Sequence, residues 1–441
     1  MKYIVSGDLT IDKIQQVVRS WNASVRPYLK KKKDYYLGKQ AILDIPDFTD
    51  SSRKRNRIVA NYCKYCVQQY TGYNVGVPVT YQVDKDIQDF LAYNDVADKD
   101  NELLKQGLIY GKSYELQYID KDKKNRFITV DAQDCIEIYS DNIDNDELLA
   151  FIRFYMTTNL GDNEIQKTWK CDIYTKDKIK TYKCGTIDLG LLTYESEIPH
   201  YFGQVPVVVY ALNSEEQGIF EQIMSLQDAY NSTRSDGQDN QDANADSYLI
   251  LKGFTLDDEV DDNGENQLDR MRHQRALEVD TDGDVYYLQK PDSSASETTT
   301  LDSIREDMFM LMNCPNFWDE HFSAQTGIAL RYKLVGFDDV SKDMMNRFEK
   351  ALRKRIELFA SINKLQGGDA SWRDAEIIFT QNVPVDEQAE ATLINSLWGK
   401  VPKEDLIGKL PFIKDAKAAI EQVNKENETQ YSFPLEGDDA E

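Results

Sequence analysis

The chain has 441 residues, of which 41% are hydrophobic and 29% are charged, and its formal net charge is −25. At about 150 residues per domain, this length accommodates two or three domains. The negative charge argues against a general nucleic-acid binder, which needs clustered Lys and Arg to displace counterions from phosphate. It is compatible with a wall past which DNA moves without sticking.

The N-terminal part predicts helices. Thr10 and Asp12 mark a helix start, and apolar residues at helical spacing follow within 9–31. A second helix is expected over 54–71, because Gly72 suits its left-handed cap.

The next part changes from helix to strand. Residues 77–83 contain Pro78 and therefore predict an edge or initiating strand. One or two helices are expected over 87–110, closed by Gly111. Short runs with turn signals between them then predict a β-rich section. Its expected strands are 113–118, 127–130, 136–139, 148–155, 168–174, 178–184 and 205–210.

The middle of the chain predicts a long helix over 214–246. Ser214 and Gln217 have the spacing of a capping box, and apolar residues follow at helical spacing only as far as Tyr230. A helix that is apolar in one half and polar in the other cannot lie in one core throughout. The polar half must face another domain, another copy of the chain or solvent; a polar linker over 231–246 is the alternative.

An excursion over 247–291 follows, and a helix over 295–313, stopped by Pro315, returns from it. The expected strands of the excursion are 248–251, 276–279 and 285–288. Aspartates 280, 282 and 284 resemble a calcium loop, but the glycine and the closing glutamate of that motif are missing, so we interpret them as turn residues.

The C-terminal part begins with a stretch, 316–333, that is neither clearly helix nor strand. A long helix is expected over 338–365, ended by Gly367 and Gly368. The remaining expected elements are a strand at 375–379, a small helical unit at 386–398, 403–410 and 413–427, and a disordered acidic tail from 428 to 441.

No catalytic constellation is recognisable. The chain has three histidines outside any known motif, and metalloprotease, nucleophile-elbow, P-loop and dinucleotide-binding motifs are absent. His321 follows two acidic residues but is best interpreted as a polar loop residue. Cys63 and Cys66 form a CxxC that Cys171 and Cys184 could complete as a zinc site. Because the CxxC lies within a helical pattern, we favour reduced, half-buried thiols of a cytosolic protein. We expect no cofactor and no metal.

The chain also lacks a run of eighteen apolar residues and an N-terminal signal segment. It is therefore expected to be soluble and intracellular, without a membrane partner.

Several stretches resemble the portal proteins of tailed bacteriophages, the head-to-tail connectors of the siphophage type. The most specific are LQDAYN, within residues 219–236, and GIALRYKL, within 327–339. Supporting similarity lies in NRIVANYCKYCVQQYTGYNVGVPVTY (56–81), LIYGKSYELQYID (108–120) and the C-terminal LPFIKDAKAAIEQV.

The resemblance implies an α+β, elongated portal-type fold with a β-rich wing, long stem helices, a small α/β clip and a helical crown. The implied parts are a wing at 1–213, stem helices at 214–246 and 295–313, a clip at 247–294, a tunnel loop at 314–327, a long helix and further wing at 328–385, and a crown at 386–427.

By the same resemblance, the chain is expected to form a dodecameric ring at the capsid vertex of the virion, assembled in the host cytoplasm. Double-stranded DNA would pass through it during packaging and ejection. Terminase, a head-completion adaptor, scaffold and the major capsid protein are the implied partners. The ATPase would reside in the terminase, so this chain is not expected to be an enzyme.

The resemblance also implies residues that face DNA. The expected tunnel-loop residues are Asn316, Trp318, Asp319, Glu320, His321, Ser323, Gln325 and Thr326. Transient phosphate contacts are expected from Lys333, Lys342 and Arg347. Pro315, Phe317 and Trp318 make this loop bulkier than the family pattern.

Two other readings remain open. One is another ring-forming head–tail connector or tail structural protein, although adaptors are generally short and lack a helix–insert–helix arrangement. The other is a metal-dependent DNA-processing enzyme, which nuclease activity of the purified protein would support.

Overall fold

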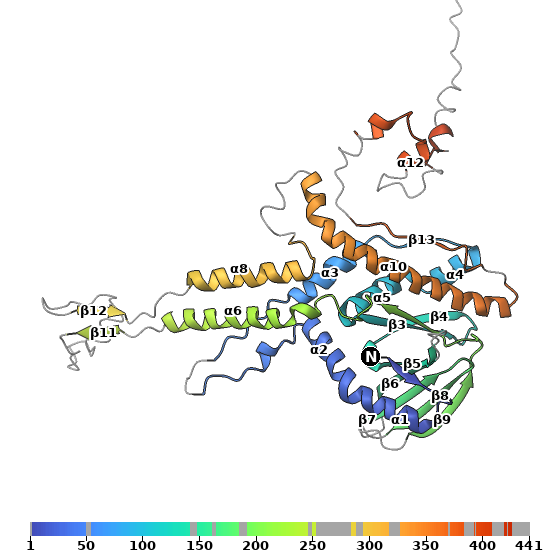
Figure 1. The fold of residues 1–441 in the computed structure, drawn as a ribbon, viewed down its shortest axis with the longest axis horizontal. Coiled ribbons are helices and arrows are strands. Elements are labelled where there is room, and N and C mark those ends of the chain that lie inside the picture. Colours follow the sequence, from blue (N-terminus) through green and yellow to red (C-terminus); the bar gives the residue numbers. More distant parts are fainter. Residues whose placement is uncertain are drawn as a thin grey trace, which may run out of the picture. The chain divides into compact units, whose positions relative to one another are not determined.

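The computed structural model describes residues 2–49, 54–141, 148–160, 165–184, 192–245, 249–252, 284–287, 294–316, 327–368, 371–382, 392, 394–407, 419–420 and 422–425. The chain divides into a large unit, residues 1–381, and a small one, residues 382–441. Mixed helix and sheet make up the large unit (Figure 1), which agrees with the expected α+β class. Among the described helices, none is long and apolar enough to cross a membrane.

The N-terminal helix begins where the sequence predicts. The Thr10 hydroxyl accepts a hydrogen bond from the Lys13 N–H, and α1 (Ile11–Ser20) follows, continued by a π-helical turn, Trp21–Val25, and by α2 (Arg26–Tyr36). A short 3₁₀ turn, Ala41–Asp44, follows α2.

Six of the described strands form the largest sheet, in the order β1-β5-β6-β7-β8-β9. Its β1 is parallel to β5, and the other neighbours are antiparallel. The strands are β1 (Tyr3–Val5), β5 (Cys135–Ser140), β6 (Leu148–Leu160), β7 (Ile165–Tyr174), β8 (Lys178–Cys184) and β9 (Thr193–Pro199). Sequence analysis missed β1 and β9. Both are sheet edges, and β9 is largely exposed, so neither shows a clear apolar pattern.

Two smaller antiparallel sheets belong to the same unit. One has the order β10-β3-β4, and the other pairs β13 with β2. Their strands are β2 (Thr80–Gln82), β3 (Lys112–Ile119), β4 (Asn125–Val130), β10 (Val207–Ala211) and β13 (Glu376–Ile378). The short β2 follows Pro78, as expected for an edge strand.

The main core lies between the three-stranded sheet and the helices around it. Its helices are α3 (Tyr62–Val75), α4 (Lys85–Tyr93), α5 (Val96–Tyr110) and α10 (Gly327–Leu365). Gly111 closes α5 with a φ of 87°, and Gly367 follows α10 with a φ of 90°, so these two of the three expected glycine caps are confirmed. The cap expected at Gly72 is wrong, because α3 continues through this residue to Val75. A second hydrophobic cluster joins α1 to the six-stranded sheet, where Phe154 and Trp169 stack with centroids 4.8 Å apart.

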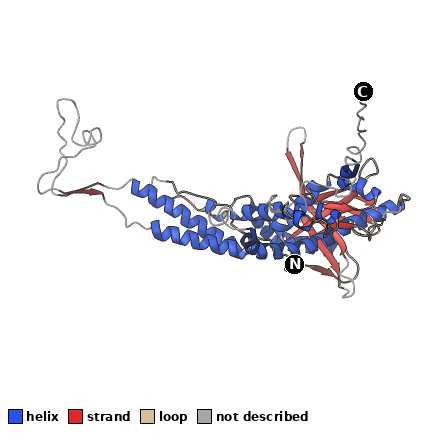
Figure 2. Cartoon of the chain, turned by 90° about the horizontal axis from the view of Figure 1, so that it is seen from above, coloured by secondary structure: helices blue, strands red, loops and turns tan. Residues whose placement is uncertain are grey.

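The helices α6 (Met224–Ala245) and α8 (Ser294–Leu311) lie side by side and antiparallel (Figures 1 and 2). The hairpin strands β11 (Leu249–Lys252) and β12 (Asp284–Tyr287) come between them in the sequence and pair with each other. This helix–insert–helix order is the one expected from sequence. The expected strand at 276–279 lies outside the described residues.

Three helix boundaries differ from the predictions. The helix expected over 54–71 is α3, which begins at Tyr62, runs past Gly72 and is followed by Gly76 as its C-cap; residues 54–61 precede it without helical structure. The helix expected from 214 begins at Met224. The helix expected from 338 begins at Gly327.

The small unit contains α12 (Lys403–Ile407) and an isolated bridge between Trp398 and Val401. Leu406 is its buried apolar residue among those described, 3% exposed. Most of the expected helices at 386–398 and 413–427, and the expected tail at 428–441, lie outside the described residues.

Candidate functional site

The predicted tunnel loop falls almost wholly outside the described residues. Asn316 is the last described residue before it, in a partly buried position after α8. The other expected loop residues, Trp318, Asp319, Glu320, His321, Ser323, Gln325 and Thr326, have no described position.

The predicted phosphate contacts belong to α10, and two of them, Lys342 and Arg347, have described side chains. Five positions separate these two, so at about 100° per residue they point in different directions around the helix. Lys342 donates to Asp338, at 2.6 Å, and this bond holds the pKa of the lysine above its usual value. Arg347 lies 3.5 Å from Asp343. The two described side chains therefore have local partners on their own helix.

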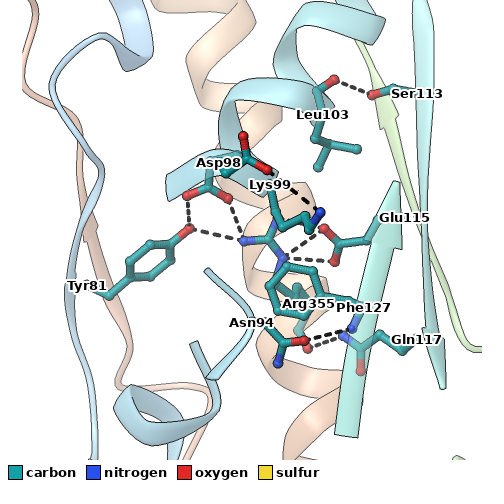
Figure 3. Close-up of polar contacts among 11 residues, drawn as sticks. Tyr81, Asn94, Asp98, Lys99, Leu103, Ser113, Glu115, Gln117, Phe127 and Arg355 are labelled. Carbon is teal, nitrogen blue, oxygen red and sulfur yellow. Dashed lines mark hydrogen bonds and ion pairs between the residues drawn. The ribbon is translucent and has the colours of Figure 1, made fainter. Parts of the chain in front are cut away.

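A buried ion cluster fixes the C-terminal half of α10 (Figure 3). Arg355 is fully buried, and its guanidinium donates to Glu115 of β3, at 2.7 Å, and to Asp100 of α5, at 2.6 Å. The Tyr81 hydroxyl donates to Asp100, at 2.7 Å, and the Phe127 ring lies 4.4 Å from the guanidinium. One side chain thus ties α10 to α5, β2, β3 and β4.

The electrostatics of this cluster favour a charged arginine. Burial opposes the charge on Arg355, but Glu115 and Asp100 outweigh it and hold the pKa of Arg355 well above its usual value. Burial raises the pKa of Glu115 even beside the guanidinium. Two carboxylates share one cation here, so removing that cation would leave both without compensation in the interior.

Side chains of α6 bind the backbone of the segment 56–62, and we call this set of contacts the α6 ladder. The acceptors are spaced four residues apart on α6, and the amides are spaced two residues apart on the segment. The bonds run from Tyr62 N–H to Gln227 (3.1 Å), from Ala60 N–H to Asn231 (3.0 Å), from Ile58 N–H to Ser235 (3.0 Å) and from Asn56 N–H to Asp239 (2.9 Å).

The α6 ladder can form because the spacing of its acceptors along the helix nearly equals the spacing of the amides along the extended segment. Four helical residues rise about 6 Å, and two extended residues advance about 6.5 Å. Gln227, Asn231 and Ser235 are all buried, so the polar half of α6 is covered along this stripe by the chain itself. The amides that it binds cannot also form helical bonds, which explains why residues 54–61 do not continue α3.

The α6–α8 contact is close where α6 has a glycine. A side-chain carbon at Gly237 would lie 2.6 Å from a carboxylate oxygen of Glu297, so a larger residue here would require the end of the Glu297 side chain to move. Nearer the main core, Tyr62 of α3 contacts Tyr230 of α6 and Phe309 of α8 edge-on. These contacts attach both helices to α3.

The connection from β10 to α6 is held by ion pairs around a cavity of about 240 Å³. Lys32 of α2 lies 2.6 Å from Glu221, and Lys112 of β3 lies 2.8 Å from Glu216 and 2.9 Å from Glu137. Burial lowers the pKa of Lys32 despite its partner Glu221.

The same connection explains the late start of α6. Glu216 has a φ of 59°, which ends any helical path from Ser214. The Ile219 N–H then bonds the Leu108 carbonyl at the end of α5, at 2.9 Å, instead of a carbonyl of its own segment. The predicted capping box at Ser214 and Gln217 is therefore wrong: Asn213 accepts from the Gln217 N–H, at 2.9 Å.

The cysteines do not form the zinc site that was considered. Cys63 and Cys66 belong to the main core, whereas Cys171 and Cys184 belong to the cluster of the six-stranded sheet. All six cysteines are free and buried rather than half-buried, and burial raises the pKa of Cys63 to about 12. Across the described part of the chain, no group of His, Cys, Asp and Glu could hold a metal ion.

Sequence reasoning missed two features of this region. Arg355 looked like one of several basic residues on the outer faces of the long helix, and only its position in the 3.6-residue period, one before the apolar Ile356, hinted at burial. The α6 ladder had a visible signal: Gln227, Asn231, Ser235 and Asp239 recur every four residues. A polar stripe of that spacing was interpreted as facing another domain, another copy or solvent.

The comparisons with known proteins agree on one family. The model of the family described as phage portal protein, SPP1 Gp6-like, matches residues 19–432. The portal protein of Bacillus phage SPP1 is 25% identical over 464 residues, and the match covers 96% of this chain and 88% of that protein.

One solved structure with a similar chain is described as the neck of an empty GTA particle computed with C6 symmetry. The similarity covers 81% of this chain and 88% of that chain, with 12% identity and a TM-score of 0.42.

Proposed function

The chain belongs to the SPP1 Gp6-like family of phage portal proteins. We therefore propose that twelve copies of it form a ring at the capsid vertex of the virion. Double-stranded DNA would pass through this ring during packaging and ejection. The observation that carries the proposal is the family match over residues 19–432, which includes the helix–insert–helix segment.

The α6–α8 pair supports the ring. Both helices are attached to the main core through α3, and the α6 ladder adds bonds along one stripe of α6. Contacts spread along a helix in this way raise the free energy needed to open it locally. We expect a conduit through which DNA is driven to need a helix pair that is held firmly against its core.

The parts of the chain are assigned as follows in this proposal. Residues 1–213 and the later 328–385 form the wing and long helix, α6 and α8 form the stem, 247–294 the clip, 314–327 the tunnel loop and 386–427 the crown. The clip would dock terminase during packaging and the head-completion adaptor afterwards. Scaffold and major capsid protein would meet the ring during assembly.

The chain is proposed to be a passive conduit rather than an enzyme, with the ATPase in the terminase. Its net charge of −25, repeated around a ring, would repel phosphate and keep the passage non-adhesive. Lys333, Lys342 and Arg347 remain candidates for transient phosphate contacts. For Lys342, such a contact would have to compete with Asp338, which is already 2.6 Å away.

A charge reversal in the tunnel loop tests the DNA path. Asp319→Lys with Glu320→Lys places cations in the proposed tunnel and should slow DNA packaging by about tenfold or more, because each added cation attracts phosphate. The matched control is Asp89→Lys with Asp122→Lys, which makes the same charge change at exposed positions on α4 and in the β3–β4 turn.

Both variants should assemble as the unmodified chain does. Packaging by the loop variant at the rate of the control variant would contradict the assignment of the loop.

A further inference from the structure

Strand β10 is the last strand of its sheet and has a free edge. The Leu212 N–H bonds the Gly111 carbonyl, and the Gln117 N–H bonds the Pro206 carbonyl, both at 2.9 Å. In an antiparallel ladder alternate residues bond the same neighbour, so even-numbered residues bond β3. Val209 and Ala211 direct their backbone groups to the opposite edge, where no strand lies among the described residues, whereas the Val207 N–H bonds the Val205 carbonyl, at 2.8 Å.

A groove of about 670 Å³ runs beside this edge. Val207, Val209 and Ala211 of β10 give it an apolar side, while α10 contributes Arg347, Lys350 and Lys354. The groove therefore combines unpaired strand groups, apolar side chains and a basic wall. Such a combination is typical of sites that bind an extended peptide by adding a strand.

The positive charge of the groove is only partly neutralised. Arg347, Arg353 and Lys354 have their own carboxylates, Asp343 at 3.5 Å, Glu349 at 2.8 Å and Glu357 at 3.0 Å. Among the residues the structure describes, no carboxylate pairs with exposed Lys350 or with exposed Lys176, which also lines the groove. In a chain of net charge −25, a groove with these two lysines is complementary to an acidic segment.

We propose that the groove binds the acidic segment 428–441 of a second copy of this chain, which adds a strand to the free edge of β10. The inference rests on the proposed ring, which brings copies together. The segment has five carboxylates and no Lys or Arg. Its Tyr431, Phe433 and Leu435 alternate with a period of two, which is the pattern of a strand with one apolar face.

The single proline of this segment is compatible with the pairing. If Phe433 and its odd-numbered neighbours bond β10, Pro434 directs its missing N–H to the outer edge, where proline is tolerated. The five residues 431–435 would extend about 16 Å, the same length as the five residues of β10. The acidic residues that follow could then reach Lys350 and Lys176.

Disulfide trapping in the full-length chain tests the pairing. One variant carries Val209→Cys and another carries Phe433→Cys, and the two are mixed, assembled and mildly oxidised. The native cysteines are buried and do not compete. We expect a disulfide-linked dimer of the two variants. The matched control replaces Val209→Cys by Ile128→Cys, which lies exposed on β4 at the opposite edge of the same sheet.

Cross-linking should be about tenfold greater at position 209 than at position 128, and Lys350→Glu with Lys176→Glu should reduce it several-fold. Equal cross-linking at the two positions, or no effect of the charge reversal, would overturn the proposal. A further variant carries both cysteines in one chain. If a disulfide formed only within that chain and never between two chains, the proposal would also be overturned. Electron micrographs of the same samples, with and without scaffold, separate the two proposals: rings without the cross-link refute only this pairing, whereas rings absent from both samples refute the proposed function as well.

Discussion

At the scale of single residues, the long helix depends on one buried cation. The Arg355 side chain has no exposed surface and contacts Glu115 and Asp100. The nearby Arg353 side chain is 36% exposed and pairs with Glu349. The two arginines are two positions apart and have very different environments. This contrast allows a direct comparison of a buried and an exposed ion pair on the same helix.

Arg355→Met should lower the free energy of unfolding of the large unit by about 3–5 kcal/mol, because two buried carboxylates lose their counter-ion. Urea denaturation monitored by tryptophan fluorescence measures the change. Arg353→Met is the control and should cost less than about 1 kcal/mol. Equal effects of the two substitutions would show that the buried cluster does not hold α10 in place.

A second residue-scale prediction concerns pH. Burial opposes ionisation of Glu216, but its bond to Lys112 and the lysine charge outweigh burial and lower the pKa of this carboxyl. A carboxyl with a lowered folded-state pKa stabilises the fold above its unfolded pKa, and this contribution is lost as the pH falls through the folded value. Stability should therefore decrease from about pH 5 downward.

Glu216→Gln should make this acid-side decrease shallower, as measured by urea denaturation between pH 6 and pH 3. At neutral pH the variant should be less stable than the unmodified chain. An unchanged slope would mean that the Glu216–Lys112 pair contributes nothing to the pH dependence.

At the scale of elements, the α6 ladder shows why some boundaries could be predicted and others could not. Local signals located the caps at Thr10, Gly111 and Gly367, because each acts through its own backbone conformation. The start of α3 depends on acceptors about 165 to 183 positions away in sequence, on α6. No local pattern contains that information, so a basic, polar run before α3 was interpreted as helix.

Ser235→Ala tests the ladder. It leaves the Ile58 N–H without its acceptor in a partly buried position, which should cost about 1–3 kcal/mol. Hydrogen exchange of the Ile58 amide should accelerate by about tenfold or more, since 1.4 kcal/mol corresponds to a factor of ten.

The matched control is Gln241→Ala, at an exposed position on the same helix, which should change exchange at Ile58 little. Equal exchange rates in the two variants would contradict the view that the ladder holds residues 56–62 against α6.

At the scale of the whole molecule, the order of elements was more predictable than their contacts. The β-rich section, the two long helices and the insert between them follow from periodicity and turn signals. The family was recognisable from LQDAYN, whose Gln227 and Asn231 turn out to be buried members of the ladder. The proposed tunnel loop and most of the crown remain predictions, since they lie outside the described residues.

The central claim is that copies of this chain form a ring, and the mass and shape of the purified full-length protein test it most directly. Native mass spectrometry combined with negative-stain electron microscopy gives both. The account predicts rings of about a dozen copies with a central hole. Such rings are closed because a head-to-tail interface with a fixed rotation between copies returns to the first copy. A protein that stays monomeric or dimeric at every concentration, and also in the presence of scaffold, would contradict it.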